Sequence, residues 1–255
     1  MTDERRHYML GEVSRVGVIA CEVFFREIAY FAAISSEVFD IVFLPKGLHD
    51  LGGQKMRETI QPEIDRMNEK DYKRIVLGYA LCNNGSAGLT TRRAPLIIPK
   101  AHDCVTLFFG SRQKYKEYFF KKTGTIFHTT GWLERGDGDQ PVLDGLLRQD
   151  LAEYIAKYGE ENGRFLWETL NPEKNYHRIA YINLPLPGLP DLRTESMKTA
   201  HEKGWEWEEI SGDSGMIRRL LNGPYSKDEF VVVNPGETVV ATNDEEIIGT
   251  SKNNS

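Results

Sequence analysis

The three cysteines are the residues of this sequence whose type and placement best suit chemistry. Each follows a short apolar run: Val16-Gly-Val-Ile-Ala-Cys21, Arg74-Ile-Val-Leu-Gly-Tyr-Ala-Leu-Cys82 and Ala94-Pro-Leu-Ile-Ile-Pro-Lys-Ala-His-Asp-Cys104. Thiolates bind zinc and iron–sulfur clusters. Three protein ligands leave one position open, on a zinc ion or on one iron of a 4Fe–4S cluster. We therefore predict a metal site formed by Cys21, Cys82 and Cys104, holding either a 4Fe–4S cluster or zinc.

His102 is a candidate fourth ligand. In an extended segment, side chains two residues apart point the same way, so His102 and Cys104 are expected to reach one ion. The competing interpretations are a satisfied loop histidine and, for each cysteine alone, a small buried hydrophobic residue. The sequence has no Cys-x-x-Cys pair, so the prediction depends on the placement of the cysteines and not on a local motif.

Other polar residues are expected beside the cysteines. His49 is a candidate general acid or base, with a helix-capping or surface histidine as the alternative. Arg26 is a candidate partner for a ligand carboxylate or phosphate, with an ion pair to Glu22 one helical turn earlier as the alternative. Asn83 offers an amide beside Cys82. The residues expected to bind a ligand are Tyr79, Asn84 and Trp132.

The elements that must position these residues form an α/β fold. Strand-like and helix-like segments alternate along the chain, which predicts a mainly parallel, doubly wound sheet with helices on both faces. Ligands of such sheets bind outside the carboxyl ends of the strands. Loops after neighbouring strands lie about 5 Å apart, so the thiols meet if their three strands are neighbours. The sequence pattern does not determine that strand order.

The predicted division of the chain follows a Gly- and Asp-rich linker near residues 135–140. Residues 1–135 are expected to form an N-terminal α/β unit that carries the cysteines. Residues 141–242 are expected to extend its sheet or form a second lobe, and the polar segment 243–255 to be a loose tail.

The composition of the chain disfavours several classes of function. The 255 residues have a formal net charge of −6, which disfavours nucleic acid as a partner. No segment approaches the roughly 20 apolar residues of a membrane span, and the first residues lack the apolar core of a secretory signal. An odd number of cysteines argues against a disulfide framework and for a reducing compartment. We therefore expect a cytoplasmic protein with a small-molecule substrate.

Several segments resemble the DUF1638 family of proteins of unknown function. The most specific are those that contain the cysteines: Ala20-Cys-Glu-Val23, Gly78-Tyr-Ala-Leu-Cys-Asn-Asn-Gly85 and Pro99-Lys-Ala-His-Asp-Cys104. Shorter ones are Leu44-Pro45, Leu48-His49, Gly131-Trp132, Gly212-Asp213 and Pro235-Gly236. The resemblance extends over nearly the whole chain. It implies a setting in corrinoid-dependent one-carbon metabolism, with corrinoid-pathway proteins as further partners. A second copy of the chain is a separate expected partner.

The expected function is that of a metal-dependent enzyme, a lyase, hydrolase or transferase, whose open coordination position activates a small substrate. The alternative is a zinc-thiolate methyltransferase, or an accessory or carrier protein, in corrinoid-dependent metabolism. Metal content separates both from a protein whose cysteines only fill the core.

Overall fold

A computed structural model describes residues 14–135, 155–156, 159–164 and 176–252 of the chain. Its larger sheet has five strands in the order β2-β1-β3-β4-β8. The first four run parallel, and β8 is antiparallel to β4. The strands are β1 (Arg15–Cys21), β2 (Val38–Leu44), β3 (Arg74–Gly78), β4 (Leu96–Pro99) and β8 (Phe230–Val233).

The central strands are almost continuous apolar runs. Every residue of β3 and β4 is buried, as are six of the seven residues of β1. This pattern is typical of parallel strands that are covered on both faces, whereas a half-exposed strand would alternate apolar and polar residues. The predicted α/β class with a mainly parallel sheet is confirmed.

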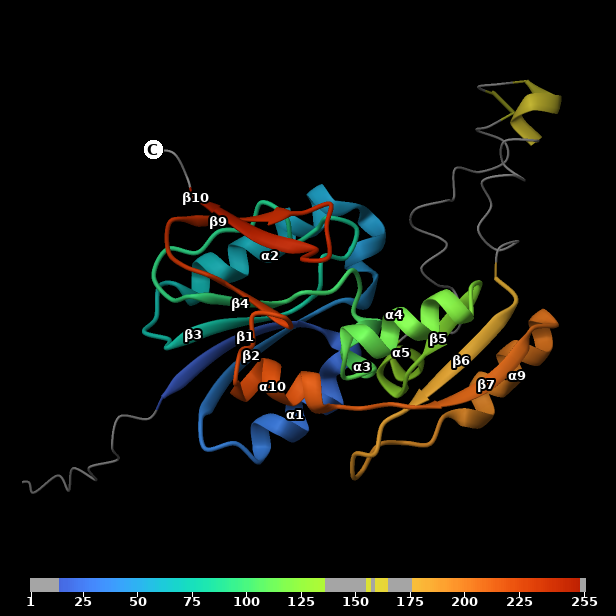
Figure 1. The fold of residues 1–255 in the computed structure, drawn as a ribbon, viewed down its shortest axis with the longest axis horizontal. Helices are drawn as coiled ribbons and strands as arrows, with labels where there is room; N and C mark the ends of the chain where they lie inside the picture. The colour runs from blue at the N-terminus through green and yellow to red at the C-terminus, as the bar shows by residue number, and fades with distance from the viewer. Residues whose placement is uncertain (1–13, 136–154, 157–158, 165–175, 253–255) are drawn as a thin grey trace, which may run out of the picture.

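Helices cover both faces of this sheet (Figure 1). On one face, α1 (Phe25–Ala33) contacts α10 (Gly215–Asn222), which contacts β3 and β4. On the other face, α2 (Gly53–Met67) contacts β1. Short 3₁₀ segments, η1 (Glu22–Phe24) and η2 (Lys46–Leu51), lead out of β1 and β2 toward the helices.

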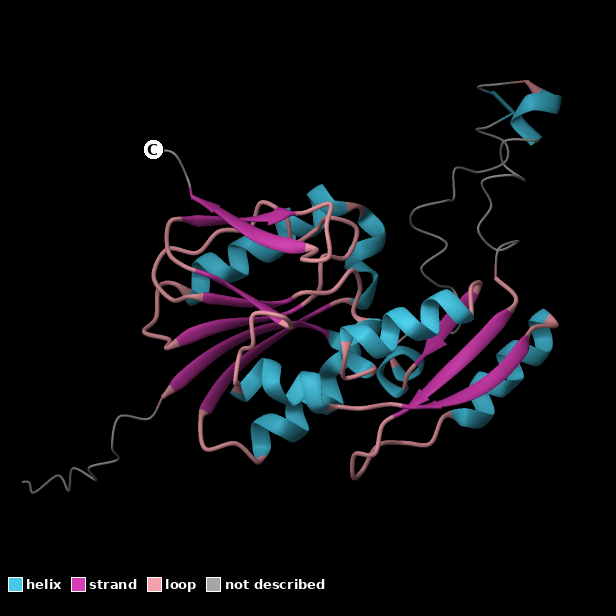
Figure 2. Ribbon diagram, in the orientation of Figure 1, coloured by secondary structure: helices cyan, strands magenta, loops and turns pink. Residues whose placement is uncertain are grey.

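A second sheet of three parallel strands lies beside the first (Figure 2). Its order is β5-β6-β7, and α9 contacts β6 and β7. Between the two sheets lie three short helices (Figure 1). The elements are α3 (Val105–Phe108), α4 (Arg112–Lys121), β5 (Thr125–His128), α5 (Thr130–Glu134), β6 (Arg178–Asn183), α9 (Arg193–Lys203) and β7 (Glu206–Ser211).

The two sheets are interleaved along the sequence. The strand β5 precedes the expected boundary near residue 135 yet pairs with β6, and β8 returns to the first sheet beside β4. Residues 136–140 of the expected linker lie outside the described residues.

The segment expected to be a loose tail, residues 243–255, contains a strand. Residues up to 252 form β10 (Ile248–Lys252), which pairs antiparallel with β9 (Glu237–Ala241). Ile247 and Ile248 are buried and anchor this hairpin, which explains why a mostly polar segment is ordered.

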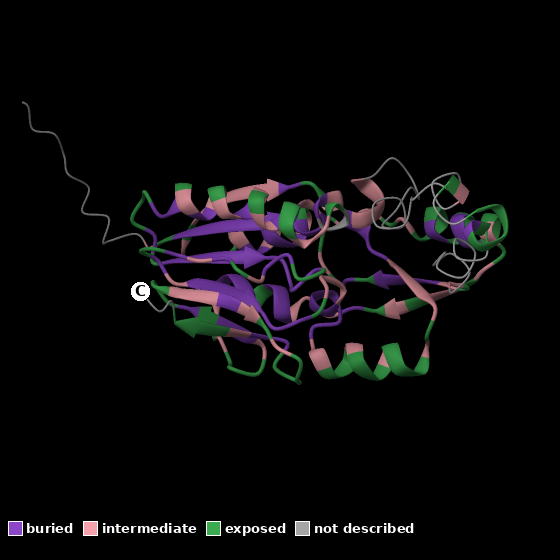
Figure 3. Cartoon of the chain, turned by 90° about the horizontal axis from the view of Figure 1, so that it is seen from above, coloured by how far each residue is buried: buried purple, intermediate pink, exposed green. Residues whose placement is uncertain are grey.

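Burial is greatest in the strands of the larger sheet and least in α4 (Figure 3). No residue of α4 is buried, and its Phe119 and Phe120 are exposed. In the described part of the chain, no helix has the length and apolar character needed to cross a bilayer.

Candidate functional site

The strand order places the three cysteine-bearing strands next to one another. β1 pairs with β3, and β3 pairs with β4, so Cys21, Cys82 and Cys104 follow three neighbouring strands. Beyond the strands, Leu81 N donates to Ala101 O and Cys82 N to His102 O, each at 2.9 Å. These bonds keep the two loops side by side, and the Sγ atoms of Cys82 and Cys104 lie 3.5 Å apart. The adjacency on which the predicted thiol site depends is therefore present.

The turn that carries Cys82 has an unusual backbone. Cys82, Asn83 and Asn84 have φ values of 42°, 57° and 60°, three consecutive residues in the left-handed region. Asparagine tolerates this region, but a cysteine there costs roughly 1–2 kcal/mol. The turn is closed by Gly85 N donating to Cys82 O at 3.0 Å. Strain of this kind is concentrated at functional sites, where the surrounding structure holds a side chain in a set direction.

Tyr79 lies among the three thiols. Its side chain is buried, and its hydroxyl donates to Leu44 O at 3.4 Å. Burial raises the pKa of the Tyr79 phenol, and Cys21, Cys104 and Cys82 raise it further. The predicted ligand-binding residue Tyr79 is thus an inner wall of the cluster, and its phenol stays protonated.

Two of the thiols, those of Cys21 and Cys104, have raised pKa values. Burial raises the pKa of the Cys21 thiol, and Cys104 and Glu22 add to the rise. The Cys104 pKa is raised by the hydrogen bond with Cys82, by burial and by Asp103. The charged side chains Glu22 and Asp103 are both acidic, so they oppose thiolate formation. A bound cation would reverse this balance and displace the thiol protons.

His102 does not share the expected extended segment with Cys104. The strand β4 ends at Pro99, and the chain then bends so that Cys104 adopts helical angles at the start of α3. His102 is exposed and lines a cavity beside the thiol loops. The chain bends here because the Asp103 carboxylate accepts hydrogen bonds from Val105 N at 3.0 Å and Thr106 N at 3.3 Å. These bonds begin helix α3.

Two predicted residues, Arg26 of α1 and Trp132 of α5, have protein partners. Arg26 Nε donates to the Glu134 carboxylate at 2.7 Å and not to Glu22, which accepts from Lys46 N at 2.9 Å. The Lys46 ammonium lies 4.7 Å from the centroid of the Trp132 ring. These contacts join α1, α5 and η2 into a polar wall near Cys21.

The remaining predicted residues lie in two places, the turn at Cys82 and the 3₁₀ segment η2. Asn83 and Asn84 are exposed on the turn beside Cys82. The backbone of His49 lies in η2, and its side chain lies outside the described residues.

Glu27 is a residue that the sequence analysis missed. It is buried in α1, and its Oε2 atom has no hydrogen-bond partner among the described residues. Burial raises its pKa to about 7, and Glu134 adds to the rise. An acidic residue between Val23, Phe24, Ile28 and Phe31 on the apolar face of a helix is the sequence signal for it.

The donor set suits a single soft metal ion. Two thiolates on a tetrahedral ion with metal–sulfur bonds of about 2.3 Å lie about 3.8 Å apart, close to the observed contact. In the described residues, no three His, Cys, Asp or Glu side chains are already arranged as a ligand set. Ligation by all three thiols therefore requires rotation about side-chain bonds.

Comparison with known proteins gives one match. A family model described as "Protein of unknown function (DUF1638)" matches residues 43–221, which is more than half of the chain. The match contains Cys82 and Cys104 and begins after Cys21, so it is shorter than the resemblance seen along the sequence. Neither the curated proteins nor the solved structures gave a match.

Proposed function

Because this chain belongs to the DUF1638 family, described only as proteins of unknown function, we propose its function from the site itself. Cys21, Cys82 and Cys104 bind a metal centre with an open coordination position, and the protein is an enzyme that activates a small substrate there. The observation that carries this proposal is the 3.5 Å contact between two thiols on adjacent strand-exit loops.

The same contact favours zinc over an iron–sulfur cluster. Two cysteines on one ion have sulfurs about 3.8 Å apart. In a 4Fe–4S cluster each cysteine binds its own iron, so the sulfurs are more widely separated. When bound, zinc with three thiolates would supply Lewis acidity or an activated thiolate to a substrate.

The protein groups around the thiols have separate roles in this proposal. The left-handed turn holds Cys82 against Cys104, and the Tyr79 phenol excludes water from the inner side of the site. Asn83 and Asn84 are the exposed amides at its outer side, where they can donate to a polar substrate. His102 and Asp103, which precede Cys104 in the chain, line the neighbouring cavity.

Methyl transfer to a thiol is the second candidate function. A zinc ion held by thiolates can bind and activate an acceptor thiol, and the single-ion geometry of Cys82 and Cys104 is what favours this candidate. It would place the protein in corrinoid-dependent one-carbon metabolism, as a transferase or as a metal carrier. Methyl transfer from a methylcorrinoid to a thiol measures the transferase activity directly.

The proposal is tested by metal analysis of reduced, anaerobically purified protein. We expect about one zinc per chain in the wild type, and a loss of affinity in Cys104→Ala that exceeds the roughly 10–100-fold caused by losing an outer-shell partner. Thr199→Ala, which removes a buried side chain in α9 of the second sheet, should keep the metal. Detection of iron with sulfide and a visible absorption band would instead identify the metal centre as an iron–sulfur cluster. Protein that takes up neither metal after reconstitution would rule out the metal centre.

A further inference from the structure

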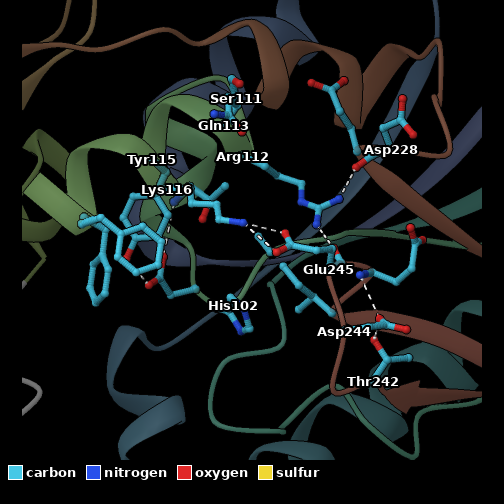
Figure 4. A pocket seen from close by; sticks show the side chains of 18 of the residues that line it. His102, Ser111, Arg112, Gln113, Tyr115, Lys116, Asp228, Thr242, Asp244 and Glu245 are labelled. Atoms are coloured by element: carbon cyan, nitrogen blue, oxygen red, sulfur yellow. Dashed lines mark hydrogen bonds and ion pairs between the residues drawn. The ribbon is translucent and has the colours of Figure 1, made fainter.

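A large cavity lies beside the thiol loops and is separate from the cysteines (Figure 4). Its volume is about 1130 Å³, larger than the roughly 300–1,000 Å³ of a typical ligand pocket. One wall is the loop 101–103, the second is the first three turns of α4, and the third is the loop 242–247 between β9 and β10. No cysteine lines it.

Three cations hold the loop 242–247 against this cavity. The Lys116 ammonium donates to both carboxylate oxygens of Glu245, at 2.7 and 2.9 Å. Arg112 donates to the backbone oxygen of Asp228 at 2.6 Å and to that of Glu245. Lys100 pairs with Glu246. The acidic loop thus occupies, with its own carboxylates, the anion positions that the cavity wall offers.

The Lys100 pair is the most informative of these contacts. The side chain of Lys100 is only 9% exposed, whereas that of Glu246 is 59% exposed. A buried ammonium requires an anionic partner because its desolvation is otherwise unfavourable. Glu246 supplies this anion, so the pair fixes the loop through Lys100, which lies outside the cavity lining.

The Glu245 carboxylate is the readily replaced contact of this loop. Its side chain is 82% exposed, so solvent screens its pair with Lys116. Ile247, at the base of the loop, has a φ of 65°, and a β-branched residue in the left-handed region costs roughly 1–3 kcal/mol. Replacement of the Glu245 carboxylate on Lys116 by a ligand anion would therefore lose little, while the buried Ile247 and the Lys100–Glu246 pair keep the base of the loop in place.

Two other acidic groups of the wall, Glu229 and Asp244, already have partners. The Glu229 carboxylate binds Arg219 at 2.6 and 2.7 Å. Asp244 accepts from the Thr242 hydroxyl at 2.7 Å and from Glu246 N at 2.9 Å. Arg112 and Lys116 are consequently the groups that a ligand anion would meet.

An aromatic surface completes the cavity. Tyr115 and Phe119 are 5.9 Å apart between ring centroids, and Phe120 follows them along α4. Phe119 is 50% exposed and Phe120 70% exposed. These rings offer an apolar surface beside the cations.

We propose that this cavity binds a small molecule with at least two anionic groups, carboxylate or phosphate, which replace the Glu245 carboxylate on Lys116 and the Glu245 backbone oxygen on Arg112. The loop 242–247 is an internal substitute for that ligand. The apolar body of the ligand lies against Tyr115 and Phe119. The proposal concerns binding alone and does not depend on a metal at the cysteines.

Titration calorimetry of the full chain at low salt tests the proposal with three probes. Citrate and pyrophosphate distinguish carboxylate from phosphate, and adenosine diphosphate tests the aromatic wall. We expect at least one to bind, and Lys116→Gln to weaken its binding about tenfold because a charge-assisted hydrogen bond is lost. Lys114→Gln is the matched control: Lys114 lies on the same helix but pairs with Asp213 outside the cavity, so its loss should change affinity less than about twofold.

A variant in the loop 242–247 is expected to have the opposite effect on anion affinity. Glu245→Gln frees the exposed Lys116 without disturbing the core, so it should tighten anion binding. The Cys104→Ala variant should bind the anion as the wild type does, which separates this site from the metal centre. The proposal fails if no probe binds either the wild type or Glu245→Gln at millimolar concentration. Equal weakening by Lys114→Gln and Lys116→Gln would also overturn it, because it would indicate general charge attraction.

Discussion

At the scale of single residues, the site is defined by groups kept in their neutral form. The Cys21 and Cys104 thiols and the Tyr79 phenol all have raised pKa values, chiefly because burial and neighbouring groups disfavour the charged form. The left-handed turn at Cys82 adds backbone strain at the same place. The raised pKa values of Cys21 and Cys104 are consistent with thiols that ionise when a cation enters.

Glu27 allows a residue-scale prediction of pH dependence. Its pKa in the folded protein is raised from 4.5 to about 7, so its contribution to stability is present below pH 4.5 and is lost as the pH rises through about 7. Glu27→Gln cannot ionise and avoids this loss. At about 1.4 kcal/mol per pKa unit, the variant should be more stable than the wild type by up to roughly 3 kcal/mol at pH 8. The measurement is urea unfolding at pH 4.5 and pH 8.

The matched control for Glu27 is Glu58→Gln, an exposed position on α2. This change should alter the free energy of unfolding by less than about 0.5 kcal/mol at either pH. A Glu27→Gln variant that is less stable than the wild type at pH 8 would contradict the prediction. That result would mean that the Glu27 carboxylate has a stabilising partner.

At the scale of elements, the thiol loops depend on how closely β1 and β3 approach. Gly78 pairs with Ala20 in the parallel ladder, one residue before Cys21. A Cβ atom at Gly78 would lie 2.5 Å from Ala20 Cβ and 3.1 Å from Ala20 Cα. These atoms belong to the sheet and cannot rotate away, so glycine is required for the two strands to bring their cysteines together.

Gly78→Ala should therefore destabilise the protein and disturb the site. We expect a cost of about 1–3 kcal/mol in unfolding free energy, as for overpacked cores, together with weaker zinc binding. The control is Gly17→Ala on β1, where the new Cβ would meet the flexible Met67 side chain at 2.5 Å. Chemical denaturation and zinc titration of both variants test this. Equal effects of the two substitutions would show that the approach of β1 and β3 is not what limits the site.

At the scale of the whole molecule, one ion pair joins three elements at the opposite end of the larger sheet. Arg74 of β3 donates to the Glu37 carboxylate at 2.9 Å and to Leu221 O of α10 at 2.6 Å. Glu37 lies just before β2. The pair thus connects an edge strand, a central strand and a covering helix.

This ion pair predicts how the protein responds to acid. Arg74 lowers the Glu37 pKa from 4.5 to about 2, so the stabilisation is present above pH 4.5 and is lost as the pH falls toward 2. Glu37→Gln should lose about 3 kcal/mol at pH 7, because Arg74 is left buried with its charge uncompensated. The variant should lose less additional stability than the wild type between pH 4.5 and pH 2.

Thermal unfolding across this pH range, with Glu202→Gln as an exposed control on α9, measures the effect. The control should follow the wild-type curve. If Glu37→Gln also follows it, the Arg74 pair does not contribute to acid stability.

The local pattern of the sequence determined the class of the fold and the positions of the thiols. Short apolar runs identify β1, β3 and β4, and their length places Cys21, Cys82 and Cys104 at or after strand ends, because a buried strand must be apolar throughout. The family resemblance also follows from local segments, and the family match confirms it. The same patterns did not reveal Glu27, whose burial depends on the neighbours of α1.

Only the tertiary structure decided which strands are neighbours and which loops meet. The order β2-β1-β3-β4-β8 depends on contacts between distant segments, and no local period encodes it. Lys116 and Glu245 are 129 positions apart, so neither their pairing nor the cavity they border can be read from spacing. The bend at His102 and the strand β10 likewise depend on a carboxylate cap and on buried isoleucines. Local sequence thus fixes where reactive groups leave a strand, whereas long-range packing fixes what they meet.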